Sequence, residues 1–230
     1  MKDLSLFTER TGIVFKDDGL LRQAFTHRSY LNEHPEQKIA HNERLEFLGD
    51  AVLELVVTDH LFKRFPEKHE GEMTAYRAAL VNTIMLSAVA ADLGFSDFLL
   101  LSRGEAQDTG KARQYILANT YESVVGAVFL DQSYDVAARF IASSLLPRLE
   151  SVLRDGSWQD AKSVFQEKAQ EVLSITPSYK VLSESGPDHD KHFSIGVFLG
   201  EEEAGRGDGK SKQEAEQSAA RDALGEKGWE

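Results

Sequence analysis

Apolar residues recur at helical spacing through roughly the first two thirds of the chain. Between residues 42 and 65 they occupy most of a helical circumference, with Asn42 placed as an N-cap and Pro66 as a stop signal. The same periodicity predicts further helices over residues 17–30, 70–94, 115–132 and 133–153, and the glycines of residues 102–114 predict a loop. The first part of the chain is therefore expected to be all-α.

The pattern changes beyond residue 160. Residues 161–173 and 211–227 have helical periodicity, whereas the intervening ranges alternate as strands do. The three expected strands, the last being the weakest, cover residues 177–185, 191–200 and 203–209. This α-β-β-β-α order predicts a small α+β domain at 160–230, joined to an all-α domain at 1–153 by a linker at 154–159.

Composition narrows the class of protein. The chain has no cysteine, which excludes disulfides, thiolate metal sites and a cysteine nucleophile. Neither a signal peptide at the N-terminus nor a run of ~20 apolar residues is evident, so a cytoplasmic protein without a membrane partner is expected. The net charge is −12, and both halves are acidic, with −5 over residues 1–154 and −7 over residues 155–230. Binding to an anionic partner would therefore depend on local cationic clusters or on metal ions.

Acidic side chains form a stripe in the otherwise apolar helix at 42–65. At about 100° per residue, Glu43, Glu46 and Asp50 share one face. A solvated helix face explains this stripe equally well on spacing alone. A second pair, Asn119 and Glu122, stands three residues apart on another apolar helix. Oxygen ligands on two facing helices are typical of a hard-cation site, and Mg²⁺ prefers such ligands.

Several segments resemble bacterial ribonuclease III. The stretch "ERLEFLGD" (residues 43–50) is close to the signature of that family. The segments "AFTHRSY", "FPEKHEGEMTAYRAALV" and "ILANTYESVVGAVFLD" resemble the surrounding family sequence. Residues 160–228 resemble a double-stranded-RNA-binding domain through "GPDHDKHF" and "GKSKQEAEQSAA".

That resemblance implies an Mg²⁺-dependent endoribonuclease, with Mn²⁺ as a substitute, that cuts double-stranded RNA to 5′-phosphate and 3′-hydroxyl ends during rRNA and mRNA processing. It also implies a homodimer, in which Phe47 packs into the partner, although ordinary core packing would explain Phe47 equally well. The implied metal ligands are Glu46, Asp50, Asn119 and Glu122, with Asp50 and Glu122 catalytic and Glu43 and Glu70 as further acids of the same cleft.

Asn119 departs from the family pattern, which usually has aspartate there. An amide oxygen can ligate Mg²⁺ but contributes no charge. An active enzyme with one neutral ligand is the preferred interpretation, since the five acidic residues remain. A catalytically impaired protein that only binds double-stranded RNA is the alternative. A helical hydrolase of small phosphorylated compounds is a further rival, which the C-terminal module argues against.

The C-terminal module is expected to recognise the shape of duplex RNA. By resemblance, its RNA contacts are Ser163, Gln166 and Glu167 on the first helix, His189 in the turn, and Lys210, Ser211 and Lys212 at the last helix. Gln213 stands where a basic residue is frequent, so weak binding with a shallow salt dependence is expected. In the helical domain, Arg103, Lys111 and Arg113 form the best local basic patch, although a solvated turn explains them almost as well.

Overall fold

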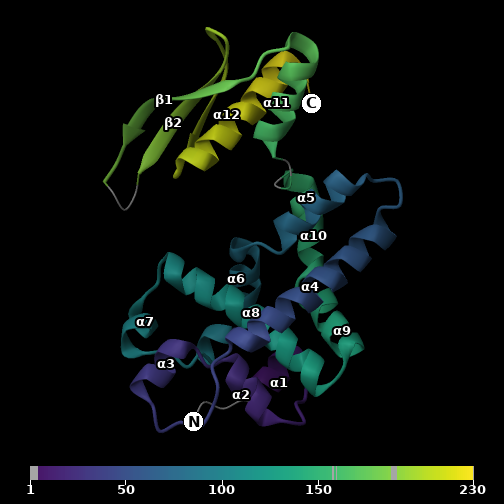
Figure 1. Ribbon diagram of the computed structural model, residues 1–230, viewed down its shortest axis with the longest axis vertical. Helices are drawn as coiled ribbons and strands as arrows, with labels where there is room; N and C mark the ends of the chain where they lie inside the picture. The colour runs from purple at the N-terminus through teal and green to yellow at the C-terminus, as the bar shows by residue number, and fades with distance from the viewer. Residues whose placement is uncertain (1–4, 157, 159, 188–190, 230) are drawn as a thin grey trace. The chain divides into compact units, whose positions relative to one another are not determined.

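The computed structural model describes residues 5–156, 158, 160–187 and 191–229 (Figure 1). The chain divides into two compact units, Met1–Trp158 and Gln159–Glu230. The first is all-helical and the second combines a three-stranded sheet with two helices. This agrees with the predicted fold class.

Ten α-helices and two short 3-10 helices make up the described part of the first unit. Their bounds are α1 (Ser5–Thr11), α2 (Asp18–Ala24), α3 (Arg28–Glu33), α4 (Glu43–Arg64), α5 (Glu70–Leu80), α6 (Thr83–Asp92), η1 (Phe95–Asp97), α7 (Arg103–Gln107), α8 (Lys111–Asp131), α9 (Tyr134–Ser144), η2 (Leu146–Arg148) and α10 (Leu149–Asp155).

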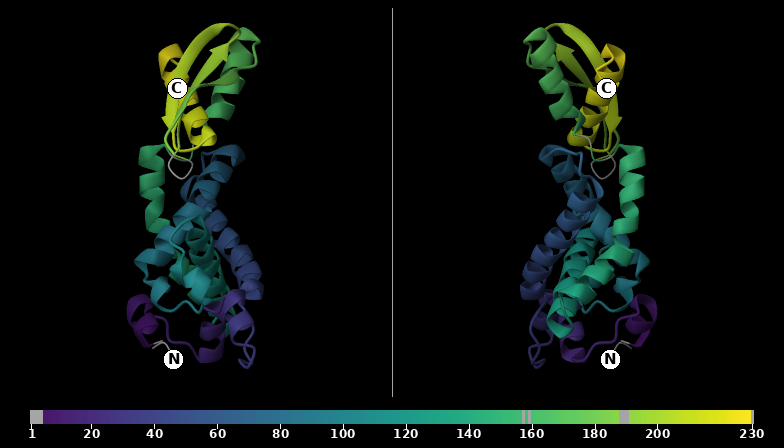
Figure 2. Two further views of the ribbon diagram at one scale, coloured as in Figure 1. Left: turned by 90° about the vertical axis from the view of Figure 1, so that its left-hand side faces the viewer. Right: turned by 90° about the vertical axis from the view of Figure 1, so that its right-hand side faces the viewer.

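Helices α4 and α8 form the central pair of this unit and run side by side (Figure 2). Glycine lets the two backbones approach closely. A Cβ on Gly49 would lie 1.8 Å from the carbonyl oxygen of Glu122, and one on Gly126 would lie 2.2 Å from that of Leu45. No larger side chain fits at either position, so the crossing of α4 and α8 is fixed where both helices carry their acidic residues.

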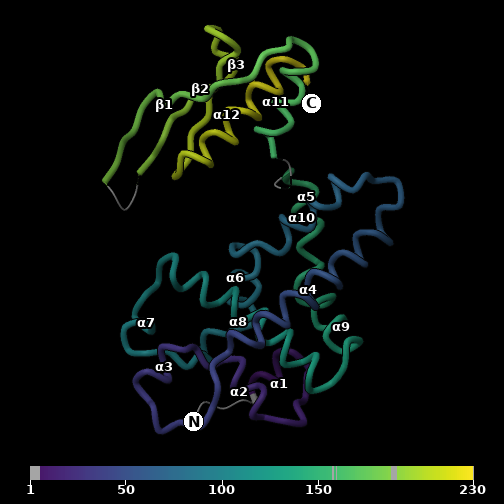
Figure 3. The backbone as a smooth tube through the Cα atoms, viewed as in Figure 1, coloured from purple at the N-terminus to yellow at the C-terminus, as the bar shows by residue number. Residues whose placement is uncertain are grey.

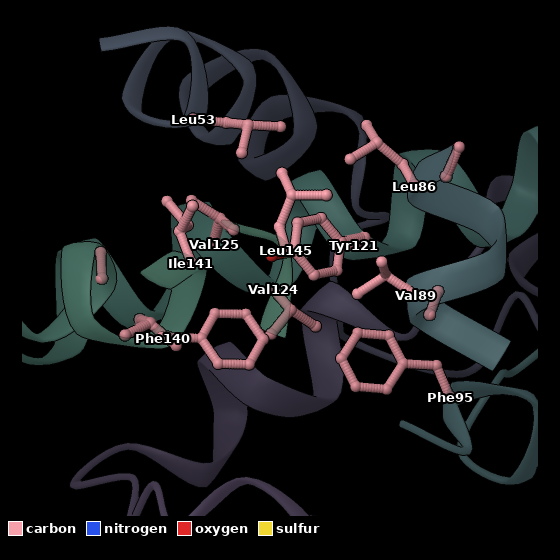
Figure 4. Close-up of a cluster of buried hydrophobic side chains, with 14 of the residues drawn as sticks. Leu53, Leu86, Val89, Phe95, Tyr121, Val124, Val125, Phe140, Ile141 and Leu145 are labelled. Atoms are coloured by element: carbon pink, nitrogen blue, oxygen red, sulfur yellow. The ribbon is translucent and has the colours of Figure 1, made fainter. Parts of the chain in front are cut away.

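The core around α8 is apolar and aromatic (Figure 4). Tyr121 is fully buried at its centre, stacked against Phe140 with ring centroids 5.6 Å apart. The hydroxyl of Tyr121 lies 2.8 Å from Oγ of Ser144, which satisfies this buried polar atom. Helices α6 and α9 supply Leu86 and Ile141 to the same cluster, so α8 is surrounded on most sides.

Several local predictions differ from the structure. The helix expected at 133–153 is divided into α9, η2 and α10. The helix expected at 70–94 is broken into α5 and α6, because Asn82 caps α6 by accepting a hydrogen bond from the amide of Met85 at 2.9 Å. The helix expected at 17–30 ends at Ala24, because Thr26 bridges to Leu100. The loop expected at 102–114 contains α7 and the first turn of α8.

Asn42 stands at the start of α4, but its side chain does not cap that helix. The amide Nδ2 of Asn42 instead donates to the carbonyl oxygen of Ala24 at 3.3 Å, which ties the beginning of α4 to the end of α2.

The segment expected as a linker is partly ordered onto the first unit. Helix α10 continues through Asp155 and ends at Gly156, which has the left-handed φ of 62°. Trp158 packs edge-on against Tyr76 of α5 with ring centroids 4.7 Å apart. The aromatic contact explains why chain beyond α10 stays with the helical unit.

The second unit contains α11 (Ala161–Leu173), β1 (Ser178–Ser185), β2 (His192–Leu199), β3 (Glu202–Gly209) and α12 (Lys212–Lys227). The strands are antiparallel in the order β1-β2-β3 (Figure 3). Helix α12 lies directly on β3, where a Cβ on Gly207 would be 2.1 Å from the amide nitrogen of Ala219. Glycine at every second position of β3, together with the small alanine side chains of α12, therefore allows the helix to lie close to the strand.

In the described part of the chain, no single helix is long and apolar enough to cross a membrane. Helices α5 and α6 reach that length and composition only as a pair, with a bend of 46° between them.

Candidate active site

The acidic stripe of α4 faces the polar pair of α8. Glu46 and Glu122 are both half-buried, and their charges affect one another. Burial, together with the charges of Asp50 and Glu46, raises the pKa of Glu122 to about 8. Burial and the charges of Glu43 and Asp50 likewise raise the pKa of Glu46. The structure thus brings Glu46, Asp50 and Glu122 together, in an arrangement that concentrates negative charge.

Asn119 completes this group from α8. The Asn119 side chain lowers the pKa of Glu46 and so opposes part of the rise that burial causes. Its amide adds no negative charge beside Glu46, and its NH₂ group is a donor from which a carboxylate can accept. Asparagine therefore relieves charge repulsion that aspartate would increase at this position.

The donor set fits a hard divalent cation. Three carboxylates and an amide oxygen are ligands that Mg²⁺ and Mn²⁺ accept. Within the described residues, no three histidine, aspartate or glutamate side chains already converge as a complete metal site. Burial and the charges of Asp50 and Glu46 raise the pKa of Glu122, so a bound cation would relieve a charge repulsion that these side chains exert on one another. Glu46, Asp50, Asn119 and Glu122 are the residues that would hold the cation.

The two further acids lie in different places. Glu43 neighbours Glu46 and is flanked by two basic side chains, with Arg28 Nη1 3.7 Å and His41 Nδ1 3.8 Å from its carboxylate oxygens. Neither basic residue was predicted from the sequence to belong to the site. His41 directly precedes the acidic helix, whereas Arg28 lies in the "AFTHRSY" segment and reaches Glu43 only through the fold.

Glu70 does not join this group within one chain. It begins α5 and lines a hollow of about 170 Å³ with Leu61 and Phe62, which belong to the last turns of α4. Those turns are roughly 16 Å along the helix from Asp50. Glu54 pairs with a cation instead, since Arg77 Nε lies 3.1 Å from its carboxylate. The shared cleft expected for Glu70 is thus not formed by a single copy of the chain.

Comparisons with known proteins identify the family of this chain. The family described as "Ribonuclease-III-like" matches residues 17–149, more than half of the chain, and the "Double-stranded RNA binding motif" matches residues 161–226. The chain belongs to the ribonuclease III family. It is 46% identical to a "Ribonuclease 3" of Anoxybacillus flavithermus over 95% of this chain and 91% of that protein. A "Ribonuclease 3" of Borreliella burgdorferi is 42% identical over 96% of this chain and 90% of that protein.

Solved structures extend the likeness to the fold of the helical unit. The nuclease domain of ribonuclease III from Campylobacter jejuni is 38% identical, with a TM-score of 0.56, and the match covers 62% of this chain and 93% of that domain. A second structure of the same domain has 37% identity and a TM-score of 0.56, over 63% of this chain and 99% of that domain. It is described as flexible in a region involved in dimer formation.

In this ribonuclease III family member, Phe47 is not a core residue. Its side chain is 83% exposed on α4. Leu55 and Phe62 of the same helix are 57% and 67% exposed, so an apolar face of α4 is open to solvent. Core packing, the alternative interpretation of Phe47, is wrong.

The ribonuclease III basic patch expected near the loop is only partly a loop feature. Arg103 begins α7, and its backbone amide donates to the carboxylate of Glu33 at 3.1 Å. Lys111 and Arg113 belong to the first turn of α8, roughly two turns before Asn119. These cations therefore flank the acidic group along α8.

The RNA contacts expected in the second unit fall on two helices. Ser163, Gln166 and Glu167 are exposed on α11. Lys210 and Lys212 are exposed where α12 begins, and Nζ of Lys212 lies 5.8 Å from the ring centroid of Phe193. His189 lies outside the described residues.

The beginning of α12 is already capped by the chain itself. Ser211 Oγ accepts from the amide of Glu214 at 3.2 Å, and the Glu214 carboxylate accepts from the amide of Lys210 at 2.8 Å. Without these hydrogen bonds, the backbone amides of Lys210 and Glu214 would be available to a phosphate. The helix terminus expected to assist phosphate binding is thus partly occupied.

Proposed function

We propose that this chain is a divalent-cation-dependent endoribonuclease that hydrolyses double-stranded RNA to 5′-phosphate and 3′-hydroxyl ends. The observation that carries the proposal is the uncompensated acidic group formed by Glu46, Asp50 and Glu122 where α4 meets α8. Family membership and the double-stranded-RNA-binding motif support RNA as the substrate.

A bound Mg²⁺ or Mn²⁺ would make an attacking water more acidic and neutralise charge at the phosphate. The chain's own contribution is to present oxygen ligands from two rigid helices. Glu122, with its pKa near 8 in the cation-free chain, holds a proton that it must release before it can act as a charged ligand. Glu43, between Arg28 and His41, extends the negative surface at the beginning of α4.

We further propose that two copies form a homodimer through the exposed apolar face of α4. Phe47 and Phe62 provide aromatic area that a single chain leaves in water. In a twofold-symmetric dimer each copy contributes the same surface, and the exposed apolar face of α4 can pack against its counterpart in this way. Glu70, distant from Glu46 in one chain, would then reach an acidic cleft only from the partner.

We place the activity in rRNA and mRNA processing in the cytoplasm. The name "Ribonuclease 3" of the curated relatives supports a ribonuclease, and the absence of cysteine is consistent with a reducing compartment.

The second candidate is a protein that binds double-stranded RNA without cutting it. Asn119 favours this candidate, because an amide brings no negative charge to the ligand set. Metal-dependent cleavage of duplex RNA therefore distinguishes the two candidates.

Titration of Mg²⁺ against cleavage of a long RNA duplex tests the proposal. We expect the parent chain to cut the duplex. Asn119→Asp should cut at roughly tenfold lower Mg²⁺ concentration, because the added ligand charge raises the affinity for Mg²⁺. Glu122→Gln should lose at least about a hundredfold in cleavage rate. End labelling of the products measures the 5′-phosphate. If neither the parent chain nor Asn119→Asp cuts at any Mg²⁺ or Mn²⁺ concentration, the RNA-binding candidate replaces the enzyme.

A further inference from the structure

One end of the sheet in the second unit gathers charged residues from β1, from α12 and from the residues just before β2 and just after β3. Glu184 of β1 pairs in register with Phe193 of β2, and Phe193 pairs with Gly209 of β3. Directly opposite residues of antiparallel strands point to the same face of a sheet. Phe193 faces α12, because Nζ of Lys212 lies over its ring. Glu184 therefore points towards the beginning of α12, which lies at the same end of the sheet (Figure 1).

Acidic groups offset the cations at this end. Nζ of Lys191 lies 2.6 Å from Oε1 of Glu184. The hydrogen bond from Lys191, and the charges of Lys191 and Lys212, lower the pKa of Glu184, so that it is ionised at neutral pH. The carboxylate of Glu214 is bound to the amide of Lys210. Among the described side chains at this end, two glutamates lie close to Lys191, Lys210 and Lys212 and offset part of their positive charge where phosphates are expected to bind.

We propose that Glu184 restrains RNA binding: it holds Lys191 in an ion pair and offsets Lys212 beside the expected phosphate contacts. This inference rests on the proposed binding of duplex RNA by the second unit. Each of these side chains is solvent-accessible, so their rearrangement does not disturb the core. Glu184 is thus a residue that sets affinity without being required for the fold.

The chain offers a matched control in Glu202. Its Oε1 lies 2.8 Å from Nζ of Lys227, and the hydrogen bond from Lys227 lowers the pKa of Glu202 as Lys191 does for Glu184. Glu202 pairs with Leu199, at the opposite end of β2 from Phe193. Glu184→Gln and Glu202→Gln therefore remove the same charge from the same kind of exposed ion pair at two ends of one sheet.

The test is binding of a 20–30 base-pair RNA duplex to the full chain in EDTA, measured by fluorescence anisotropy from low to high salt. We expect Glu184→Gln to bind roughly two- to fivefold more tightly at low salt, as an exposed charge pair allows. The dependence of log K on log salt should also become steeper by up to about 0.9, corresponding to one more phosphate contact. Glu202→Gln should bind as the parent chain does.

The outcomes separate this inference from the proposed function. If the parent chain binds and Glu184→Gln binds equally or more weakly, the restraint is refuted while RNA binding stands. Equal gains in Glu184→Gln and Glu202→Gln would reflect net charge alone and would also refute it. If the parent chain fails to bind the duplex at any salt concentration, both proposals fail.

Discussion

At the scale of single residues, Asn119 and Glu122 have opposite electrostatic effects on one group. Glu122 adds a carboxylate to a half-buried site and has a raised pKa, whereas Asn119 adds no charge and lowers the pKa of Glu46. Asparagine therefore makes the cation-free site less repulsive and makes the cation-bound site less negative. Asparagine in place of aspartate at position 119 thus stabilises the folded chain without metal and lowers the affinity of the ligands for a cation.

The raised pKa of Glu122 predicts how stability varies with pH in EDTA. A carboxyl that titrates near 8 when folded and near 4.3 when unfolded takes up a proton on folding between these values. Its contribution is therefore complete below about pH 4.3 and is lost progressively as the pH rises towards 8. Glu122→Gln should abolish this loss and be more stable than the parent chain at pH 8, by about 1–2 kcal/mol after allowance for solvent screening.

Thermal unfolding of both chains between pH 5 and 9 measures the difference. The two curves should converge towards pH 5, where Glu122 is protonated in the folded chain. Added Mg²⁺ should stabilise the parent chain more than Glu122→Gln. A constant difference across this range would show that Glu122 titrates normally.

At the scale of elements, the site depends on how closely α4 and α8 approach. Gly126 of α8 lies against Leu45 of α4, and a Cβ there would be 2.2 Å from the Leu45 carbonyl oxygen. Gly126→Ala must push the helices apart, so we expect a loss of about 3 kcal/mol in unfolding free energy. Cleavage should fall about a hundredfold in the chain that remains folded, since small displacements of ligands are costly.

Gly71 provides the control for this helix contact. It is exposed in α5, and its added Cβ would meet nothing within 4 Å. Gly71→Ala should leave stability unchanged or raise it by up to about 1 kcal/mol, because alanine favours helix. Thermal melts and cleavage rates of the two variants give the comparison. A stable, active Gly126→Ala chain would show that α4 and α8 are not held together at this point.

Periodicity predicted both central helices because apolar residues surround them, and the change of period after residue 160 predicted the α+β unit. It did not predict the break between α5 and α6, since the apolar pattern continues across Asn82 and only the cap of Asn82 separates the helices. The grouping of α4 and α8 acids followed from their spacing on each helix. The distance of Glu70 from that group did not, because spacing within one helix contains no information on where α5 lies.

At the scale of the whole molecule, charge and apolar surface have different roles. A net charge of −12 opposes RNA binding, so the proposed binding would rely on a bound cation and on a few lysines. The proposed dimer would offer two RNA-binding units and two acidic groups to one duplex, and joining them would raise the effective concentration of the second contact. Weak binding by each unit is therefore compatible with useful affinity for a long duplex.

The exposed face of α4 predicts where the dimer forms. Phe47→Ser should raise the dimer dissociation constant by about 10- to 100-fold, because a central aromatic side chain contributes a large share of interface energy. The folded monomer should be unaffected, within about 0.5 kcal/mol, because Phe47 is 83% exposed and supports no core contact. Ile84→Ser is the matched control, since Ile84 is 72% exposed but lies on α6. Sedimentation velocity over a range of concentrations measures both variants. If Ile84→Ser dissociates the dimer and Phe47→Ser does not, the interface lies away from the exposed face of α4.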